Sequence, residues 1–277
     1  MCSTINLGTP FCLDRSVLNI TSRCTLKCKL CVTGCPFYDV PPHYDLETCK
    51  KSIVRFFEIV DYVRWYELSG GEPFIHKQLP QIIEEVMQFK SKFDKLLIIT
   101  NGTLMPSEEL ENVLVRHRDK LYFMISHYGD ISVCADDLED YFKERSIEVK
   151  VKKYYGDDQH FGGWVDYGEC KNYNRSEDEL NSVFSRCGAT KMNGNLTTHN
   201  GKIHWCVPSA KNMTILKKIP DVESDYIDLF NDELSVAEQR EKIRNLYQKK
   251  YISACKYCSG GFGNENAKRY PAAEQLW

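Results

Sequence analysis

The 277-residue sequence has no apolar run long enough to cross a bilayer, since stretches such as Leu96 to Thr100 cover only a few residues, whereas a spanning helix needs about 20. Its first residues also lack the basic and apolar regions of a secretory signal peptide. The formal net charge is only −3, so no overall basic field attracts nucleic acid or an anionic membrane. We therefore expect a cytoplasmic protein whose partners include neither nucleic acid nor a membrane.

Internal repeats and low-complexity tracts are also missing, which leaves an ordinary globular fold. The composition is 42% hydrophobic and 27% charged, the balance of a protein with a sizeable core. The length allows one large domain, or one domain with a smaller appendage.

Cysteine, in contrast, is plentiful, with 13 in the chain. An odd number excludes complete internal pairing, and disulfides are rare in a reducing cytoplasm, so metal ligation or redox chemistry is favoured. Seven cysteines form two spaced sets, and six are scattered. The sets are Cys24, Cys28 and Cys31, then Cys187, Cys206, Cys255 and Cys258; the scattered residues are Cys2, Cys12, Cys35, Cys49, Cys134 and Cys170.

Strand and helix patterns alternate over the first 155 residues. For example, Ile53, Phe56, Phe57 and Val60 have the spacing of an amphipathic helix, and Ser107 is placed to cap another. The predicted strands cover 16–20, 64–68, 95–102, 120–129 and 148–155; the predicted helices cover 47–63, 79–89, 107–117 and 136–145. This alternation indicates a parallel sheet with crossover helices.

The alternation stops after Tyr155. Residues 156–176 are polar, glycine-rich and aromatic, and predict a long surface loop of the kind that is usually functional or disordered. Asn200-Gly201 then joins two β-prone runs into a predicted hairpin, and 235–250 predicts a helix.

The first cysteine set admits three cluster types. With Cys35 it nearly matches the bacterial ferredoxin run, but three residues rather than two separate Cys24 from Cys28. Zinc would need two C-x2-C pairs about 15–20 residues apart, which the sequence does not offer. The third type uses Cys24, Cys28 and Cys31 alone, three thiolates that leave one iron of a four-iron cluster open to a reactant. Cys35 is then interpreted as a loop cysteine.

This third pattern, C-x3-C-x2-C, resembles the radical S-adenosylmethionine (radical SAM) superfamily. Three further motifs follow it at successive strand ends: SGGEP at 69–73, TNG at 100–102, and Ser126. The resemblance implies an α/β fold, a partial (β/α) barrel of five or six parallel strands. It also implies a [4Fe-4S] cluster and SAM, whose reductive cleavage gives methionine and a 5′-deoxyadenosyl radical that abstracts a substrate hydrogen.

The resemblance also implies SAM contacts. Glycines at 70 and 71 would let the backbone approach the cofactor, Glu72 would accept hydrogen bonds from its cationic amine, and Lys152 could pair with its carboxylate. The residues expected to bind SAM are Leu30, Gly70, Gly71, Glu72, Pro73, Asn101, Ser126 and Lys152.

The second cysteine set, C-x13-G-x4-C followed by C-x2-C, is similar to the first part of a SPASM domain. Its truncated form, called a Twitch domain, holds one auxiliary [4Fe-4S] cluster, here through all four cysteines; structural cysteines or zinc are the alternatives. We expect a radical SAM core over 1–155, a linker or substrate loop over 156–185, and a small C-terminal β-hairpin/helix cluster-binding domain over 186–277.

A fully thiolate-ligated auxiliary cluster suits electron transfer, hence a net two-electron oxidation. The short chain with this domain is similar to the aminocyclitol (2-deoxy-scyllo-inosamine) dehydrogenases. This implies an oxidoreductase that oxidises a secondary alcohol of a polyhydroxylated sugar or cyclitol and is reduced by flavodoxin or ferredoxin. Three alternatives stay open: a radical epimerase with Cys170 or Cys134 as hydrogen donor, a peptide maturase, and an iron–sulfur electron carrier that is not an enzyme.

The resemblance assigns no catalytic base. Candidates at strand ends are His127 and Lys153, and candidates in the long loop are His160, Trp164, Glu169 and Arg175. We carry forward His127, His160, Arg175 and Cys170 as catalytic candidates.

Overall fold

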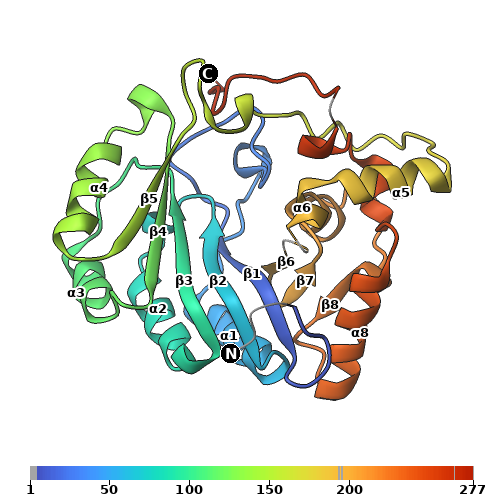
Figure 1. The fold of residues 1–277 in the computed structure, drawn as a ribbon, viewed down its shortest axis with the longest axis horizontal. Helices are drawn as coiled ribbons and strands as arrows, with labels where there is room; N and C mark the ends of the chain where they lie inside the picture. Colours follow the sequence, from blue (N-terminus) through green and yellow to red (C-terminus); the bar gives the residue numbers. More distant parts are fainter. Residues whose placement is uncertain (1–4, 193, 195, 265, 277) are drawn as a thin grey trace.

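A single curved sheet forms the centre of the protein, whose computed structural model describes residues 5–192, 194, 196–264 and 266–276 (Figure 1). Its eight strands have the order β5-β4-β3-β2-β1-β6-β7-β8. The strands are β1 (Cys12–Thr21), β2 (Tyr62–Gly70), β3 (Phe93–Thr100), β4 (Leu121–His127), β5 (Glu148–Lys153), β6 (Leu196–His199), β7 (Lys202–His204) and β8 (Tyr226–Asp228).

Helices cover the outer, convex side of this sheet (Figure 1). They are α1 (Leu46–Ile59), α2 (Leu79–Met87), α3 (Glu108–Arg116), α4 (Ala135–Glu144) and α8 (Val236–Gln248). The other helices are α5 (Glu177–Arg186), α6 (Gly188–Lys191) and α7 (Val207–Ser209). Across the described ranges, no helix is both long and apolar enough to cross a membrane.

The sheet confirms the predicted partial barrel. Strands β1 to β5 pair in parallel, and β6 adds a sixth parallel strand by pairing with β1 over Ser16–Leu18. Strands β7 and β8 then continue antiparallel. The predicted C-terminal hairpin therefore extends the barrel sheet at the edge of β1. Its assignment to a separate domain stays a prediction.

Local sequence explains these elements. Asp45 caps α1 by accepting from the backbone N–H of Thr48 at 2.8 Å, and Ser107 caps α3 as predicted, accepting from Leu110 at 3.3 Å. The apolar face of α1 is buried against the sheet. At the β6–β7 turn, Asn200 and Gly201 have φ angles of 45° and 75°, the left-handed pair that a two-residue hairpin requires.

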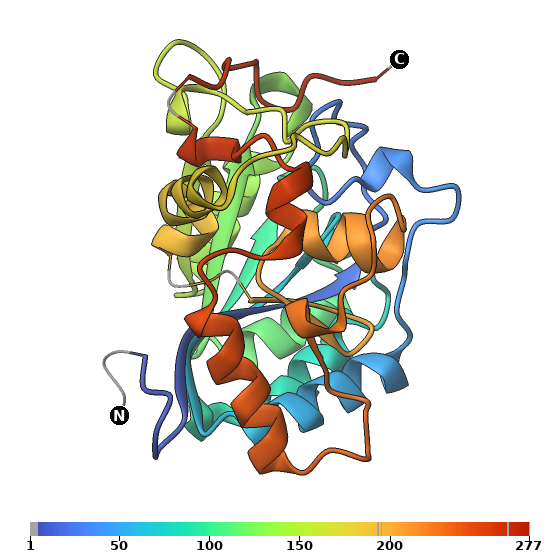
Figure 2. The same cartoon turned by 90° about the vertical axis from the view of Figure 1, so that its right-hand side faces the viewer.

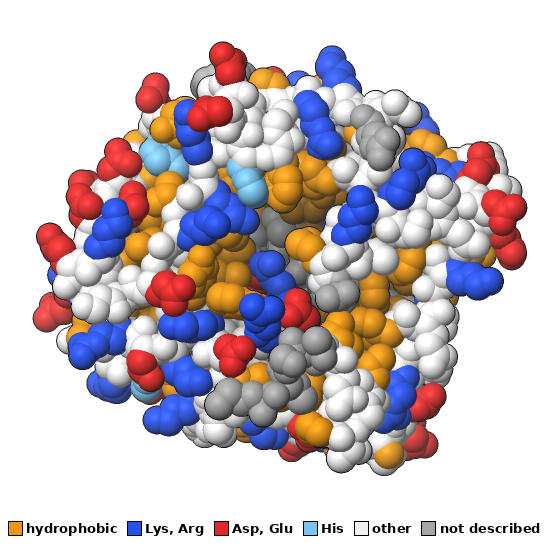
Figure 3. All heavy atoms as spheres, viewed as in Figure 1, with side chains coloured by type: hydrophobic (Ala, Val, Ile, Leu, Met, Phe, Trp, Pro, Cys, Tyr) orange, Lys and Arg blue, Asp and Glu red, His pale blue; other side chains and the backbone are white. Residues whose placement is uncertain are grey.

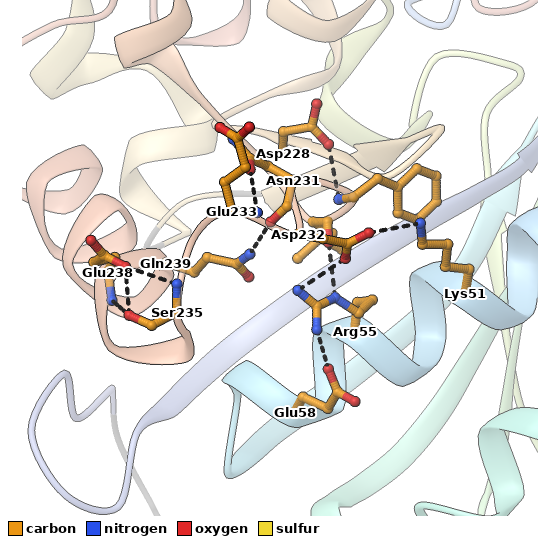
Figure 4. Close-up of polar contacts among 12 residues, drawn as sticks. Lys51, Arg55, Glu58, Asp228, Asn231, Asp232, Glu233, Ser235, Glu238 and Gln239 are labelled. Atoms are coloured by element: carbon orange, nitrogen blue, oxygen red, sulfur yellow. Dashed lines mark hydrogen bonds and ion pairs between the residues drawn. The ribbon is translucent and has the colours of Figure 1, made fainter.

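Polar contacts attach the C-terminal elements to α1 (Figure 4). The guanidinium of Arg55 donates to the carbonyl oxygen of Leu229 at 3.0 Å and lies 3.7 Å from the carboxylate of Asp232. Gln239 of α8 donates to the carbonyl oxygen of Asn231 at 3.1 Å. Exposed ion pairs contribute about 0–1 kcal/mol each, so these contacts position the segment between β8 and α8 against α1 and add little stability.

Three segments meet over the carboxyl ends of the parallel strands (Figures 1 and 2). They are the loop 22–45 after β1, the linker 154–176, and the segment 266–276 near the end of the chain. The linker is largely irregular, as predicted, with one short helical turn at His160–Gly162. The backbone of Trp164 pairs with that of Tyr270 at 2.8 and 2.9 Å. The end segment therefore closes over the linker.

Candidate functional site

The SGGEP turn packs against the chain that leads into the first cysteine set. The N–H of Gly71 donates to the carbonyl oxygen of Thr21 at 2.7 Å, and that of Glu72 to Arg23 at 2.9 Å. A Cβ atom would lie 1.9 Å from the Thr21 oxygen at position 70 and 2.0 Å from the Arg23 oxygen at position 71. Both glycines are therefore required for backbone packing in the protein itself, apart from any contact with a cofactor.

Glu72 is fully buried below this turn. One carboxylate oxygen accepts from the N–H of Phe74 at 3.1 Å and the hydroxyl of Thr100 at 3.0 Å, and the other from the N–H of Asn101 at 2.8 Å. Burial raises the pKa of Glu72 to about 7, against the lowering effect of these donors. Because a carboxylate has about four lone-pair sites, one acceptor site remains.

The first cysteine set converges with a fourth cysteine. Thr33 links two of the thiols: its hydroxyl lies 3.0 Å from Sγ of Cys31 and 3.1 Å from Sγ of Cys35. The Cys35 thiol also lies within hydrogen-bonding reach of Cys24 and Cys31. This contact lowers the pKa of Cys24, and it lowers the pKa of Cys31 to about 5. Cys35, interpreted from the sequence as a loop cysteine, thus lies among the three predicted ligands.

N–H groups already point at several of these sulfurs. Asn101 donates through Nδ2 to Sγ of Cys24 at 3.4 Å, and Gln275 through Nε2 to Sγ of Cys28 at 3.4 Å. In the second set, the N–H of Gly260 lies 3.4 Å from Sγ of Cys258. Donors of this kind are typical around thiolates that bind iron.

An aromatic cavity of about 210 Å³ lies beside the cysteine loop. Leu30, one of the residues expected to bind SAM, lines it. Ser126, the predicted contact at the end of β4, lies within hydrogen-bonding reach of the Tyr128 hydroxyl, and burial raises the pKa of Tyr128. The remaining lining side chains are Val32, Tyr128, Tyr154, Phe161, Trp164, Val165, Tyr167 and Phe262. Flat rings of this kind suit an adenine base.

The four cysteines of the second set line one cavity of about 540 Å³. Burial raises the pKa of Cys206, and it raises the pKa values of Cys255 and Cys258 to about 12 and about 11; each of these pKa values is raised further by neighbouring thiols of the set. Among the described residues that line this cavity there is no His, Asp or Glu. All-thiol ligation of this kind fits an iron–sulfur cluster.

In the described ranges, no three His, Cys, Asp or Glu side chains are placed to hold a single metal ion. A four-iron cluster binds each thiolate at a different iron, so its ligands stand farther apart than those of one ion. The zinc alternative stays open for the second set, since four cysteines also hold zinc.

Cations surround the larger cavity, and Figure 3 shows Lys and Arg side chains gathered around a hollow in the middle of this face. Those that line the cavity are Arg15, Lys152, Arg186, Lys191 and Arg269. Arg15 pairs with the buried Glu67, with Nε 2.8 Å from Oε2. Lys152, the predicted partner of the SAM carboxylate, lies in the same wall, and burial lowers its pKa.

Lys211 connects the two cysteine sets. Its stem packs so closely on Gly34 that a Cβ there would lie 2.7 Å from Cδ of Lys211. Burial lowers the pKa of its ammonium, while the thiols of Cys31, Cys170 and Cys258 act in the opposite direction. It belongs to the π-helical turn Ala210–Ile215, a geometry frequent at functional sites. The sequence around Lys211 matches no motif that would have singled it out.

The two candidate histidines lie in different surroundings. Nδ1 of His127 accepts from the N–H of Gly129 at 3.1 Å, Nε2 lies 3.5 Å from a carboxylate oxygen of Asp136, and the ring lines neither cavity. His160 packs its ring on Phe161, which lines both cavities. Its buried Nε2 has no hydrogen-bond partner among the described residues, and burial lowers its pKa.

Arg175 holds the ligand loop of the second set. Its guanidinium donates to the carbonyl oxygens of Cys255 at 2.8 Å and Cys258 at 2.6 Å, which supports a structural role; catalysis by this residue stays a prediction. Glu169 pairs with Lys171 at 2.5 Å on the surface. Lys153 pairs with Asp158 in the same way, also at 2.5 Å.

The fold and the two thiol-lined sites define an α/β partial barrel that carries its functional groups at the carboxyl ends of the strands. The signature of the Radical SAM superfamily matches residues 18–159, about half of the chain. The chain belongs to this superfamily, whose enzymes bind a [4Fe-4S] cluster and SAM.

Curated relatives share part of the sequence. The antilisterial bacteriocin subtilosin biosynthesis protein AlbA of Bacillus subtilis is 32% identical over 115 residues, 40% of this chain and 23% of AlbA. A GTP 3′,8-cyclase of Campylobacter jejuni is 30% identical over 143 residues, 49% of this chain and 44% of the cyclase. The chain thus spans less than half the length of these relatives.

Solved structures resemble the fold over most of its length. The anSMEcpe enzyme with bound AdoMet has a TM-score of 0.52 at 14% identity, covering 90% of this chain and 88% of that one. BtrN, in complex with AdoMet and 2-DOIA, has a TM-score of 0.50 at 14% identity, covering 95% and 98%. At this identity the likeness establishes the partial-barrel fold.

Proposed function

We propose that the chain is a radical SAM oxidoreductase of the cytoplasm that oxidises a secondary alcohol of a polyhydroxylated small molecule and receives its electrons from flavodoxin or ferredoxin. The observation that carries this proposal is the second thiol site. Four cysteines line one cavity, and Lys152 of the barrel lines the same cavity. A substrate held there would lie between the radical-generating site and an electron acceptor.

Both expected clusters fit the residues present. Cys24, Cys28 and Cys31 would hold the first, and Cys187, Cys206, Cys255 and Cys258 the second. The first group would supply, together with SAM, a radical able to abstract a hydrogen atom from the alcohol carbon, and the second would supply an acceptor for one electron. Loss of that hydrogen atom, that electron and the hydroxyl proton converts the alcohol to a ketone.

The chain itself must remove the hydroxyl proton, and the candidate we favour is His160, whose ring packs on Phe161 of the cavity lining. Its Nε2 is buried and unpartnered among the described residues. Because burial lowers the pKa of His160, its imidazole is neutral at pH 7 and free to accept a proton. His127 has contacts at both ring nitrogens, which makes it a weaker candidate.

The Lys and Arg side chains that line the larger cavity support a narrower substrate class than polyhydroxylated small molecules in general. In the part of the chain that the structure describes, five Lys and Arg side chains line the larger cavity and no Asp or Glu does, although Arg15 is paired with Glu67. A cluster with four thiolates would balance about two of the remaining positive charges. The surplus favours a substrate with a phosphate or carboxylate group over a neutral sugar or cyclitol.

A second candidate, a radical epimerase, is favoured by the place of Cys170. Its thiol, like those of Cys31 and Cys258, lies close enough to Lys211 to act on the pKa of that ammonium. If its thiol reaches the substrate, Cys170 would return a hydrogen atom to the substrate radical, which gives an isomer of the substrate in place of a ketone.

The test is 5′-deoxyadenosine release by anaerobically reconstituted protein, with SAM and reductant, across sugars and cyclitols offered in neutral, phosphorylated and carboxylated form. Stimulation by a charged polyol, with a product lighter by two hydrogens, supports the dehydrogenase. A product of unchanged mass supports the epimerase. Stimulation by peptides alone would contradict both proposals and support a peptide maturase. No formation of 5′-deoxyadenosine under any condition would support an electron carrier that is not an enzyme.

A further inference from the structure

The segment Ala273–Leu276 forms a short antiparallel pairing with the middle of the first cysteine loop, although about 245 positions separate them in sequence. The N–H of Leu276 donates to the carbonyl oxygen of Lys27 at 2.8 Å, and the N–H of Lys29 to that of Glu274 at 2.7 Å. Cys28 and Gln275 face each other in this bridge. Figure 1 shows the segment crossing over the loop at the end of the barrel.

The side chain of Gln275 is fixed by three partners. Oε1 accepts from the N–H of Lys27 at 2.7 Å, while Nε2 donates to the carbonyl oxygen of Ala273 at 2.6 Å and to Sγ of Cys28 at 3.4 Å. A flipped amide would set oxygen against a carbonyl and nitrogen against an N–H, so the orientation is determined. The second N–H of Gln275 therefore has to face the Cys28 sulfur.

A hydrogen bond of this type acts on a bound cluster. A donor to a ligating sulfur stabilises the reduced, more negative cluster more than the oxidised one, and so raises its reduction potential. Asn101 makes the equivalent contact to Cys24. Cys28 is 6% exposed, so solvent competes little for its sulfur.

We propose that Gln275 is a positioning residue of the first cluster, whose N–H···S bond to Cys28 raises the reduction potential of that cluster and so makes it easier to reduce. This rests on the proposed function only in that Cys24, Cys28 and Cys31 bind the cluster. It does not depend on the substrate, on the second cluster or on the reaction that follows.

The test compares reconstituted variants by electron paramagnetic resonance during a reductive titration, following the signal that SAM perturbs. Gln275→Leu removes the donor, and Gln275→Glu keeps the shape but sets a carboxylate oxygen against the sulfur. The matched control is Glu274→Gln, which alters an exposed side chain 3.4 Å from Lys29 and keeps the backbone pairing. Iron content and circular dichroism establish that each variant is folded and loaded.

We expect the midpoint potential to fall in Gln275→Leu and further in Gln275→Glu, and to stay at the wild-type value in Glu274→Gln. With limiting reductant, 5′-deoxyadenosine formation should fall about tenfold in both Gln275 variants. If Gln275→Leu loses its iron, the midpoint potential of Gln275→Glu alone tests the proposal. Unchanged potentials in loaded variants would overturn the proposal. Absence of a SAM-sensitive cluster in the wild type would instead count against the proposed function.

Discussion

The buried carboxylate of Glu72 accepts a hydrogen bond from the backbone N–H of Asn101 at 2.8 Å, which links the turn after β2 to the turn after β3. Asn101 in turn donates through its side chain to Sγ of Cys24 at 3.4 Å. Two motifs predicted to bind SAM separately are thus linked to each other and to the first cysteine. A change at either residue will alter the cluster site as well as any SAM contact.

The raised pKa of Glu72 predicts pH-dependent SAM binding. If the free acceptor site receives the cationic SAM amine, the carboxyl must lose its proton first. Since its pKa in the free protein is about 7, affinity for SAM should fall as the pH drops below 7, by up to about tenfold per pH unit. Equilibrium dialysis between pH 6 and 7.5 checks this, in a range where most of an α-amine, with an ordinary pKa of about 7.7–8.0, stays charged.

Glu72→Gln is the control for that measurement, since it cannot titrate. Its affinity for SAM should be weaker than that of the wild type at pH 7.5 and should not change with pH. A wild-type affinity that also stays constant over the range would show that the Glu72 carboxylate does not receive the amine.

Gly71→Ala should destabilise the fold by about 3 kcal/mol or more, because backbone atoms of Arg23 stand where the methyl group would lie and cannot rotate away. Gly188→Ala is the matched control, because its Cβ would meet nothing nearer than Phe262 at 3.9 Å. Urea unfolding and iron content measure both effects. Similar losses in the two variants would contradict the steric explanation.

Much of this architecture follows from sequence pattern. The cap at Ser107 and the Asn200-Gly201 turn are local features and formed where the pattern placed them. The helix predicted over 47–63 is α1, but it ends at Ile59, and Tyr62 and Val63 begin β2 instead. Local rules hold here because tertiary contacts agree with them.

Long-range pairings could not be derived from the sequence in this way. Nothing in the residues around Leu196 indicates that β6 joins β1, and nothing around Gln275 indicates its contact with Cys28. The same holds for Lys211, whose neighbours lie at positions 31, 34, 170 and 258. These contacts form only when the tertiary fold brings distant segments together, so local residue spacing does not predict them.

Substitution of Arg175 distinguishes a structural role of this residue from a catalytic one. Its hydrogen bonds to the carbonyl oxygens of Cys255 and Cys258 predict that Arg175→Met loses iron from the second site, since each such bond to a charged group contributes about 1.5–3 kcal/mol. The pH profile of any remaining turnover should match the wild type. An intact cluster with a shifted profile would instead favour a catalytic role.

His160→Gln should abolish most turnover if this residue takes the hydroxyl proton, because general-base catalysis contributes about 10²–10⁴-fold. In the wild type, activity should decrease as the pH falls below 6.5, because the pKa of His160 is lowered in the folded protein. This decrease at acid pH should be absent in His160→Gln. His117→Gln, which alters a surface contact with Glu84 at 3.0 Å, is the control. Equal losses in both variants would exclude His160 as the base.

Cys255→Ala tests the second cluster without touching the first. If each cysteine set holds four irons, the variant should bind about four irons per chain where the wild type binds about eight. Cys49→Ala controls for the loss of a cysteine, because Cys49 is buried in the core on α1, remote from both sets, and should keep the full iron content. SAM cleavage by the loaded first site should continue in Cys255→Ala, while ketone formation stops because the substrate radical has no acceptor for its last electron. Unabated ketone formation in that variant would mean that the electron leaves by another route and that the second thiol site has a structural task.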